Sequence, residues 1–341
     1  MKIIKKQKDG YARKITLLGF LEINYKSKRY SAVKEKKLNS KSIQQCKIKI
    51  SKKLVENVKD LSHTITSHND PALLAASINR FLYVPEYMNR VREAFGHFGK
   101  IDKGTRILEI GSGMGTSCLC AKAMTGAQII GLEPAPQSYK DLHKCIKSFK
   151  EANPDLDYEF LNCSGEDIPL KDGSIDFIYC FEVLEHVQNP HKVLEEIYRL
   201  LKKGGKAYIA TCNYDSFYEG HYKQFWNPFV SVEKNRKRFI RKGLSPIFLS
   251  EVNFITKNKI IKYVKEIGFS KIEFDPIPQT PIKDVELYVE ISDDAKKLIP
   301  PKGKAKKPVW RARFIQSPIV CKFLKKFNRE YKLYFTLEKS N

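Results

Sequence analysis

The segment that decides the fold is Thr105-Arg106-Ile107-Leu108-Glu109-Ile110-Gly111-Ser112-Gly113-Met114-Gly115. In it, an apolar run of strand length is followed directly by three glycines at alternate positions. Glycine allows a tight turn that brings main-chain N–H groups close to a ligand at the start of a helix. A dinucleotide-binding fingerprint has its third glycine one position later, where this chain has Thr116. The segment therefore predicts a strand, a ligand-binding glycine loop and a helix, but not a dinucleotide site.

Strand and helix patterns alternate outward from this loop. Strands are expected at residues 105–110, 128–132, 158–161, 175–181 and 206–211, and helices at 72–99 with a break at Pro85, 114–124, 137–150 and 190–201. Such alternation is typical of a parallel sheet with crossover helices on both faces. Beyond it we expect a helix at 258–267, a sixth strand at 272–274 and an antiparallel seventh at 286–291. The predicted fold class is α/β, with a seven-stranded, mostly parallel, Rossmann-like sheet.

Positive charge gathers at the two ends of the 341-residue chain, whose net charge is +24. Residues 1–60 hold 18 Lys and Arg against 5 acidic residues, and residues 296–341 hold 14 against 2. We therefore expect a basic N-terminal extension at 1–70, an α/β domain at 71–295 with an insertion at 213–250, and a basic tail at 296–341 with an amphipathic helix at 318–335. Such ends can meet nucleic acid, an anionic membrane or an acidic substrate, or can be solvated tails.

No segment predicts export or membrane insertion. The chain lacks an apolar run of the ~20 residues that a membrane span needs, and its basic start has no apolar stretch behind it. The eight cysteines form no CxxC pair, so free thiols in a reducing compartment are expected. We predict a cytoplasmic protein whose basic ends can contact the inner face of a membrane peripherally.

The glycine loop and several later segments resemble class I S-adenosylmethionine-dependent methyltransferases, of the methyltransferase type 11 kind. Glu133 ends the second strand, where a carboxylate can accept both hydroxyls of a ribose. Residues 164–170 (SGEDIPL) resemble the adenine loop of that family, with Ser164 where the family usually has Asp, and residues 200–205 (LLKKGG) resemble the turn before its fifth strand. The resemblance covers about residues 104–275. It implies an enzyme that binds S-adenosylmethionine through Glu109, Gly111, Ser112, Gly113, Gly115, Glu133, Ser164, Gly165, Glu166 and Phe181.

Four potential ligands or bases follow the fourth and fifth strands, at the carboxyl edge of the sheet where ligands bind. They are Glu182, Glu185, His186 and His221. Two carboxylates and two imidazoles predict a site for a divalent metal such as Mg²⁺ or Mn²⁺. Without a metal, His186 or His221 is the candidate general base, with Glu182 beside it. The alternative is that Glu185 and His186 only cap a helix or line the pocket.

Two further resemblances concern these residues. The pattern Glu-x-x-Glu-His with a distal His resembles the metal site of small-RNA 3′-terminal 2′-O-methyltransferases, and residues 180–187 resemble the ubiquinone-pathway catechol O-methyltransferases. Both families methylate one oxygen of a vicinal pair. The resemblance implies a metal that chelates a diol and acidifies its hydroxyl.

The insertion at 213–250 is rich in aromatic residues, which suits a carbohydrate or base-stacking pocket, or a lid with its own small core. Residues 219–222 with 226–228 resemble a methyltransferase subgroup linked to bacterial surface-polysaccharide genes. We therefore expect an O-methyltransferase acting on a hydroxyl of a sugar or surface-glycan precursor. The alternatives are an RNA 2′-O-methyltransferase that holds phosphates with its basic ends, and a non-catalytic binding protein of the same fold. Nucleic acid is the less favoured partner, because no RNA-binding module is recognisable.

Overall fold

The computed structural model describes residues 4–9, 12–17, 21–26, 44–66, 71–134, 140–244, 247–250, 252–274, 285–301 and 318–340. Contacts divide the chain into two units, Met1–Ile43 and Gln44–Asn341. The first unit holds a three-stranded antiparallel sheet of β1 (Ile4–Asp9), β2 (Ala12–Leu17) and β3 (Leu21–Lys26).

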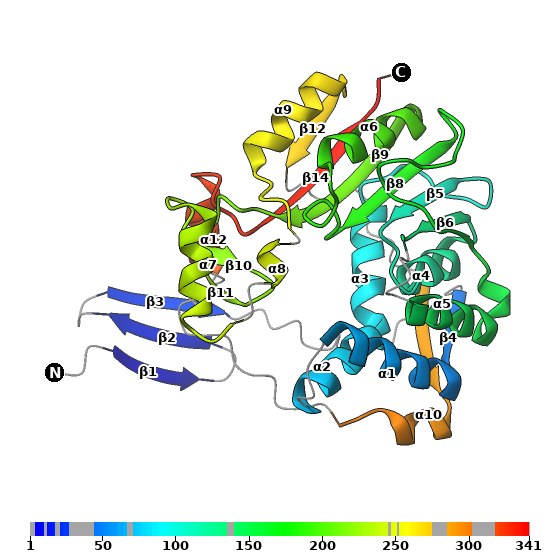
Figure 1. The fold of residues 1–341 in the computed structure, drawn as a ribbon, viewed down its shortest axis with the longest axis horizontal. Helices are drawn as coiled ribbons and strands as arrows, with labels where there is room; N and C mark the ends of the chain where they lie inside the picture. The colour runs from blue at the N-terminus through cyan, green and yellow to red at the C-terminus, as the bar shows by residue number, and fades with distance from the viewer. Residues whose placement is uncertain are drawn as a thin grey trace. The chain divides into compact units, whose positions relative to one another are not determined.

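The second unit is built around a seven-stranded sheet in the order β12-β14-β9-β8-β5-β6-β7 (Figure 1). Its strands are β5 (Arg106–Ile110), β6 (Gln128–Leu132), β7 (Glu159–Leu161), β8 (Ile175–Phe181), β9 (Leu201–Cys212), β12 (Lys271–Phe274) and β14 (Lys332–Glu338). Pairing is parallel from β7 through to β9, while β14 runs antiparallel to both β9 and β12. This confirms the predicted α/β class with a seven-stranded, mostly parallel sheet.

Both faces of the sheet are buried under helices. On β5, Ile107 enters one hydrophobic core and Leu108 and Ile110 enter the other, because successive side chains of a strand point to opposite faces. The first core is shared with α3 (Val84–Phe95), α4 (Thr116–Thr125) and α5 (Lys140–Ala152), and the second with α6 (Pro190–Leu200) and α9 (Lys257–Ile267). None of the helices in the described ranges has the length and hydropathy of a membrane span.

A further layer lies outside α5. Strand β4 (Gln44–Ile50) pairs in parallel with β13 (Val285–Ile291), and α1 (Lys52–Thr66) and α10 (Asp293–Leu298) follow these two strands. The Asn153 side chain at the end of α5 accepts from the Lys49 amide at 2.7 Å and donates to the Lys49 carbonyl at 2.9 Å, which fixes β4 to α5. Residues 44–66 therefore belong with the α/β unit, whereas the sequence assigns them to the basic extension 1–70. Helix α2 (Pro71–Phe81) packs against α1 in the same layer.

The seventh strand and the tail differ from the prediction. Residues 286–291 form a strand, but it pairs with β4 and not with the main sheet. The seventh strand of the sheet is β14, whose first four residues lie in the segment 318–335 expected to be a helix. Helix α12 ends at Lys325, and Asn328 has φ of 55°, a left-handed conformation that stops the helix before β14 begins. The alternating burial of Leu333, Phe335 and Leu337 shows why this segment is a strand, since its apolar face is fully covered.

The insertion forms a small body of its own at the carboxyl end of β9. It consists of the hairpin β10 (Tyr218–Glu219) and β11 (Gln224–Phe225), followed by α7 (Val232–Ile240) and α8 (Ile247–Ser250). Tyr214, Trp226 and Phe239 are buried together in its core, with Leu249 and Val252. Most of the aromatic residues noted in the sequence thus pack against one another, as in a lid with its own core.

Because β14 lies inside the sheet, we predict that Phe335→Ala lowers the free energy of unfolding by about 3–5 kcal/mol, as for large-to-small changes in other cores. Phe335 is fully buried between β9 and β12, whereas Phe323 on α12 is 59% exposed. The control Phe323→Ala should change stability by less than about 0.5 kcal/mol. Urea unfolding measures both. Equal, small losses for the two variants would contradict the placement of β14.

Candidate active site

The three loop glycines have left-handed backbone conformations, with φ of 77°, 52° and 79° at Gly111, Gly113 and Gly115. A Cβ on Gly111 would lie 2.1 Å from Val183 Cγ2, and one on Gly115 would lie 1.8 Å from the Tyr158 hydroxyl. A Cβ on Gly113 would meet no described atom within 4 Å. Two of the glycines are therefore required by packing, while the third faces open space into which a ligand can enter.

The polar groups around the loop fit the ribose end of S-adenosylmethionine. Glu133 accepts from the Gly113 amide at 2.9 Å through Oε2. Burial raises the pKa of Glu133, and its bond from Gly113 opposes the rise. The Ser112 hydroxyl is buried without a hydrogen-bond partner among the described residues. The half-buried Glu133 carboxylate, beside the open space at Gly113, can accept hydrogen bonds from a polyhydroxylated ligand, whereas the Ser112 hydroxyl is packed under the loop next to Gly131 of β6.

Glu109 lies beneath the loop and is 3% exposed. It accepts hydrogen bonds from the Ser117 hydroxyl, from Cys118 Sγ at 2.9 Å and from the Tyr179 hydroxyl at 3.2 Å. Burial raises its pKa to about 7, against the effect of these three donors. These bonds connect the first turn of α4 to β5 and β8. In this structure Glu109 therefore supports the glycine loop.

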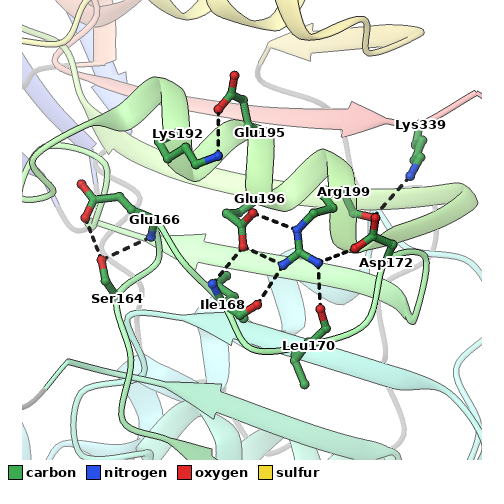
Figure 2. A network of polar contacts seen from close by, with 10 residues as sticks. All are labelled: Ser164, Glu166, Ile168, Leu170, Asp172, Lys192, Glu195, Glu196, Arg199 and Lys339. Atoms are coloured by element: carbon green, nitrogen blue, oxygen red, sulfur yellow. Dashed lines mark hydrogen bonds and ion pairs between the residues drawn. The ribbon is translucent and has the colours of Figure 1, made fainter.

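The predicted adenine loop is held by its own polar groups. Ser164 Oγ donates to Glu166 Oε2 at 2.7 Å, and the Asn189 amide donates to Glu166 Oε1 at 2.6 Å (Figure 2 draws the first contact). Gly165 lies so close to β5 that a Cβ would be 3.1 Å from Ile110 Cγ2. Ser164 and Glu166 therefore shape the loop through each other, and Gly165 allows it to close over the sheet.

Arg199 on α6 fixes the rest of that loop (Figure 2). Its guanidinium donates to the carbonyls of Ile168 and Leu170, both at 2.8 Å, and to Asp172 at 2.6 Å. It also makes a bidentate contact with Glu196, at 2.8 and 2.7 Å, and Glu196 in turn accepts from the Ile168 amide at 2.9 Å. The hydrogen bond with Glu196 raises the pKa of Arg199, so this anchor stays charged. The sequence gives no signal for this network.

Glu182, at the turn after β8, is held by cations. It contacts Lys332 of β14, Arg90 of α3 at 3.2 Å and Arg80 of α2 at 3.8 Å. Burial acts to raise its pKa, but these three charges outweigh burial and lower the pKa to about 2. Its φ of 58° is rare for a residue with a side chain and indicates that the turn is held by its surroundings. Glu182 is thus a permanent anion paired internally.

Glu185 also has internal partners. It is 1% exposed and accepts from the Thr211 hydroxyl at 2.8 Å and from the Cys212 amide at 3.4 Å. These bonds join the turn after β8 to the end of β9. Glu185 therefore positions the neighbouring His186, and its carboxylate is already satisfied.

The two histidines come together. His186 Nε2 and His221 Nε2 lie 3.3 Å apart, and the rings meet edge to face. His221 Nδ1 lies 2.7 Å from Glu219 Oε1, and the other oxygen of Glu219 accepts from the Tyr222 amide at 2.8 Å. Glu219 is fully buried and receives a further bond from the Tyr214 hydroxyl at 3.3 Å. Burial acts to lower the pKa of His221, but the bond to Glu219 and its charge raise it above 6.5.

The predicted metal site is not assembled. Of its four residues, only His186 and His221 face each other, while Glu182 is held by cations and Glu185 by Thr211 and Cys212. Within the described ranges, no group of three or more His, Cys, Asp or Glu side chains is arranged to hold a metal ion. The donor set therefore does not fit a divalent ion. The arrangement fits a hydrogen-bonded imidazole pair anchored by a carboxylate.

Sequence reasoning did not identify three residues of this site: Glu219, Arg90 and Lys332. Glu219 stands two positions before His221, and this spacing is the local signal that could have found it. Arg90 and Lys332 carry no local signal, because they reach Glu182 only through the packing of α3 and the pairing of β14.

Comparisons with known proteins identify the domain that carries the glycine loop. Residues 108–209 match the family described as "Methyltransferase domain". The chain is 33% identical over 122 residues to an uncharacterized protein of Methanocaldococcus jannaschii, covering 36% of this chain and 50% of that protein. It is 36% identical over 115 residues to a ubiquinone biosynthesis O-methyltransferase of Xanthomonas oryzae, covering 32% of this chain and 44% of that protein. It is 23% identical over 201 residues to sterol 24-C-methyltransferase of Schizosaccharomyces pombe, covering 58% and 48%.

The chain spans about half the length of the curated relatives it matches. By their names, these relatives methylate oxygen in one case and carbon in another, so the comparisons establish the domain and leave the acceptor open. Residues 108–209, which run from β5 to β9, are a class I S-adenosylmethionine-dependent methyltransferase domain.

We predict that Gly113→Ala weakens S-adenosylmethionine binding, while its cost in stability comes from the left-handed backbone conformation and is shared by the control. Its added methyl enters the open space above the loop, and crowding of this kind costs about 1–3 kcal/mol, which is roughly a tenfold to hundredfold loss of affinity. Gly173→Ala is the matched control, because Gly173 has φ of 59° and open space around it, but lies in another turn. Titration calorimetry measures both. Equal affinities for the two variants would place the cofactor elsewhere.

We predict that Glu109 makes stability depend on pH. Its pKa is raised from 4.5 to about 7 in the folded chain, so the fold favours the neutral carboxyl. The free energy of unfolding should therefore fall as the pH rises through that window and stay level above it, by on the order of 3 kcal/mol. Urea unfolding at several pH values should show this fall in the wild type and not in Glu109→Gln. Parallel curves for the two proteins would contradict it.

Proposed function

We propose that the protein is an S-adenosylmethionine-dependent O-methyltransferase whose acceptor is a hydroxyl of a sugar or surface-glycan precursor. The observation that carries the proposal is the pair His186–His221, anchored by the buried carboxylate of Glu219. A hydroxyl oxygen attacks a sulfonium methyl group well only if its proton is removed, and an imidazole with a pKa near neutrality is suited to this task.

Glu219 determines which nitrogen of His221 is basic. A carboxylate at Nδ1 favours the tautomer with the proton on that atom, which leaves the lone pair on Nε2. In this structure Nε2 faces His186, the more exposed of the two rings. We assign His221 as the proton acceptor and His186 as the residue that meets the acceptor hydroxyl and hydrogen-bonds to His221. During transfer, the O–CH₃ bond forms as the S–CH₃ bond breaks, and the hydroxyl proton moves to the imidazole pair.

The methyl donor is placed by the loop residues. Glu133 is available for the ribose hydroxyls, and Gly113 leaves space for the ligand. Arg80, Arg90 and Lys332 carry one positive charge more than Glu182 and Glu86, the two carboxylates that they contact, and this excess suits the carboxylate of the methionine end. The sulfonium group that S-adenosylmethionine supplies is the methyl source, and the protein contributes alignment and proton removal.

Two other functions remain as alternatives. An RNA 2′-O-methyltransferase would use the same base and hold phosphates with the basic ends, since 32 of the 62 Lys and Arg residues lie in residues 1–60 and 296–341. A non-catalytic binding protein would keep the fold without turnover. The intact glycine loop, Glu133 and the anchored histidine pair favour catalysis.

We predict that His221→Ala lowers kcat by about a hundredfold to ten-thousandfold, the usual contribution of a general base, while S-adenosylmethionine affinity is unchanged. The base acts in its neutral form, so activity should rise with pH through the raised pKa of His221. Glu219→Gln removes the charge that raises this pKa, and the acidic limb of log(kcat/KM) should move to lower pH. The matched control is Glu195→Gln, which removes the carboxylate 3.5 Å from His191 outside the site.

Methyl transfer is measured from labelled S-adenosylmethionine to a panel of nucleotide sugars and oligosaccharides, with single-stranded RNA as the competing acceptor. Incorporation into a saccharide that is lost in His221→Ala is the expected result. Salt-sensitive incorporation into RNA alone would favour the alternative acceptor, and wild-type pH profiles in Glu219→Gln would remove Glu219 and His221 from the mechanism.

A further inference from the structure

Exposed hydrophobic side chains gather on one part of the molecule. Among the described residues, five large hydrophobic side chains are exposed, and four of them belong to the insertion and to α12 (Pro318–Lys325) with the turn after it. These four are Phe229, Ile240, Phe323 and Phe327, with exposed fractions of 72%, 50%, 59% and 61%. Their exposure is a cost in water that a partner surface would remove.

Helix α12 has two unlike faces. Leu324 packs inward with Phe217, Tyr218 and Phe225 of the insertion, so the helix is docked on the β10–β11 hairpin. Phe323 and Phe327 are four positions apart, and their exposed rings lie 5.2 Å from each other. Lys322 and Lys326, also four apart, are exposed beside them.

The segment around α7 repeats this combination. Ile240 at the end of α7 is flanked by exposed Lys237 and Arg241. Phe229, just before α7, lies 5.8 Å from Phe217 between ring centroids, and Arg329 stacks over its ring at 5.0 Å. Phe229 therefore joins the α7 segment to the α12 segment, and Figure 1 shows α7, α12 and the hairpin gathered together.

The charge around these side chains is almost wholly positive. Within the described residues of 229–244 and 322–330, the exposed charged side chains are Lys234, Lys237, Arg241, Lys242, Lys322 and Lys326 against Glu233 alone. We call the exposed residues Phe229, Lys237, Ile240, Arg241, Lys322, Phe323, Lys326 and Phe327 the basic aromatic surface. Lysine is depleted in protein–protein interfaces, whereas apolar side chains ringed by lysine are typical of elements that lie in the headgroup region of an anionic bilayer.

We infer that the basic aromatic surface docks the protein on an anionic lipid bilayer. This surface is joined to the site through the β10–β11 hairpin, in which Tyr218 packs with Leu324 of α12 while the adjacent Glu219 holds His221.

The test is sedimentation of the full chain with vesicles, in the absence of S-adenosylmethionine and of any acceptor. Vesicles of phosphatidylcholine alone are compared with vesicles of phosphatidylcholine and phosphatidylglycerol, at low and at physiological salt. The wild type should bind only the anionic vesicles, and less at higher salt. Phe323→Ser with Phe327→Ser should abolish binding, and Lys322→Glu with Lys326→Glu should weaken it at least about fivefold for each lysine.

Two matched controls separate this surface from the overall positive charge. Tyr83→Ser removes the fifth exposed hydrophobic residue, and Lys100→Glu with Lys103→Glu changes the net charge as much as the α12 pair does. Both controls should bind vesicles nearly as the wild type does. Equal losses in the control and test pairs would assign binding to net charge and overturn the inference. The inference would also be overturned if the wild type bound no vesicles and instead formed a dimer that Phe323→Ser with Phe327→Ser dissociates. Because no turnover is measured, failure here leaves the proposed function standing.

Discussion

The antiparallel pairing of β14 with β9 is the constraint on which the arrangement of the site depends. Its register places Lys332 opposite Cys212, so β14 begins where β9 ends, at the carboxyl end of β9. The residues that flank this point are held together there, since the Asn213 amide donates to the Tyr331 carbonyl at 3.1 Å, at the edge of the sheet where ligands bind in α/β folds. That anchoring brings Lys332 to Glu182 and holds the hairpin of His221 within reach of His186.

A second contact joins the donor side of this edge to the acceptor side. Gly111 in the loop after β5 packs against Val183 in the turn after β8 so closely that no side chain could stand at position 111. The same turn presents His186, while Glu185 fastens it to Thr211 at the end of β9. The loop that would bind the methyl donor and the imidazole pair that would take the proton are therefore parts of one packed edge, which suits a reaction that depends on alignment.

The sequence predicts the parts of this fold that local forces decide. Strands β5, β6 and β8 carry buried apolar runs, and α9 ends at Gly268, whose φ of 94° suits glycine. The sequence misplaces the seventh strand because segments 285–291 and 332–338 both alternate, and the choice of partner depends on distant contacts. The sequence correctly predicts that His186 and His221 lie close together, because they follow adjacent parallel strands. It reads Glu182 as a ligand because the cations that neutralise it come from three separate elements.

The central claim is that the glycine loop holds the methyl donor beside the imidazole pair. A crystal structure of the full chain with S-adenosylhomocysteine tests it most directly. We expect the ribose hydroxyls within hydrogen-bond distance of Glu133, at about 2.6–3.2 Å, the ligand in the space beside Gly113, and the sulfur on the side of the site that His186 and His221 face. A ligand bound away from Glu133, or a sulfur directed away from the two histidines, would contradict it.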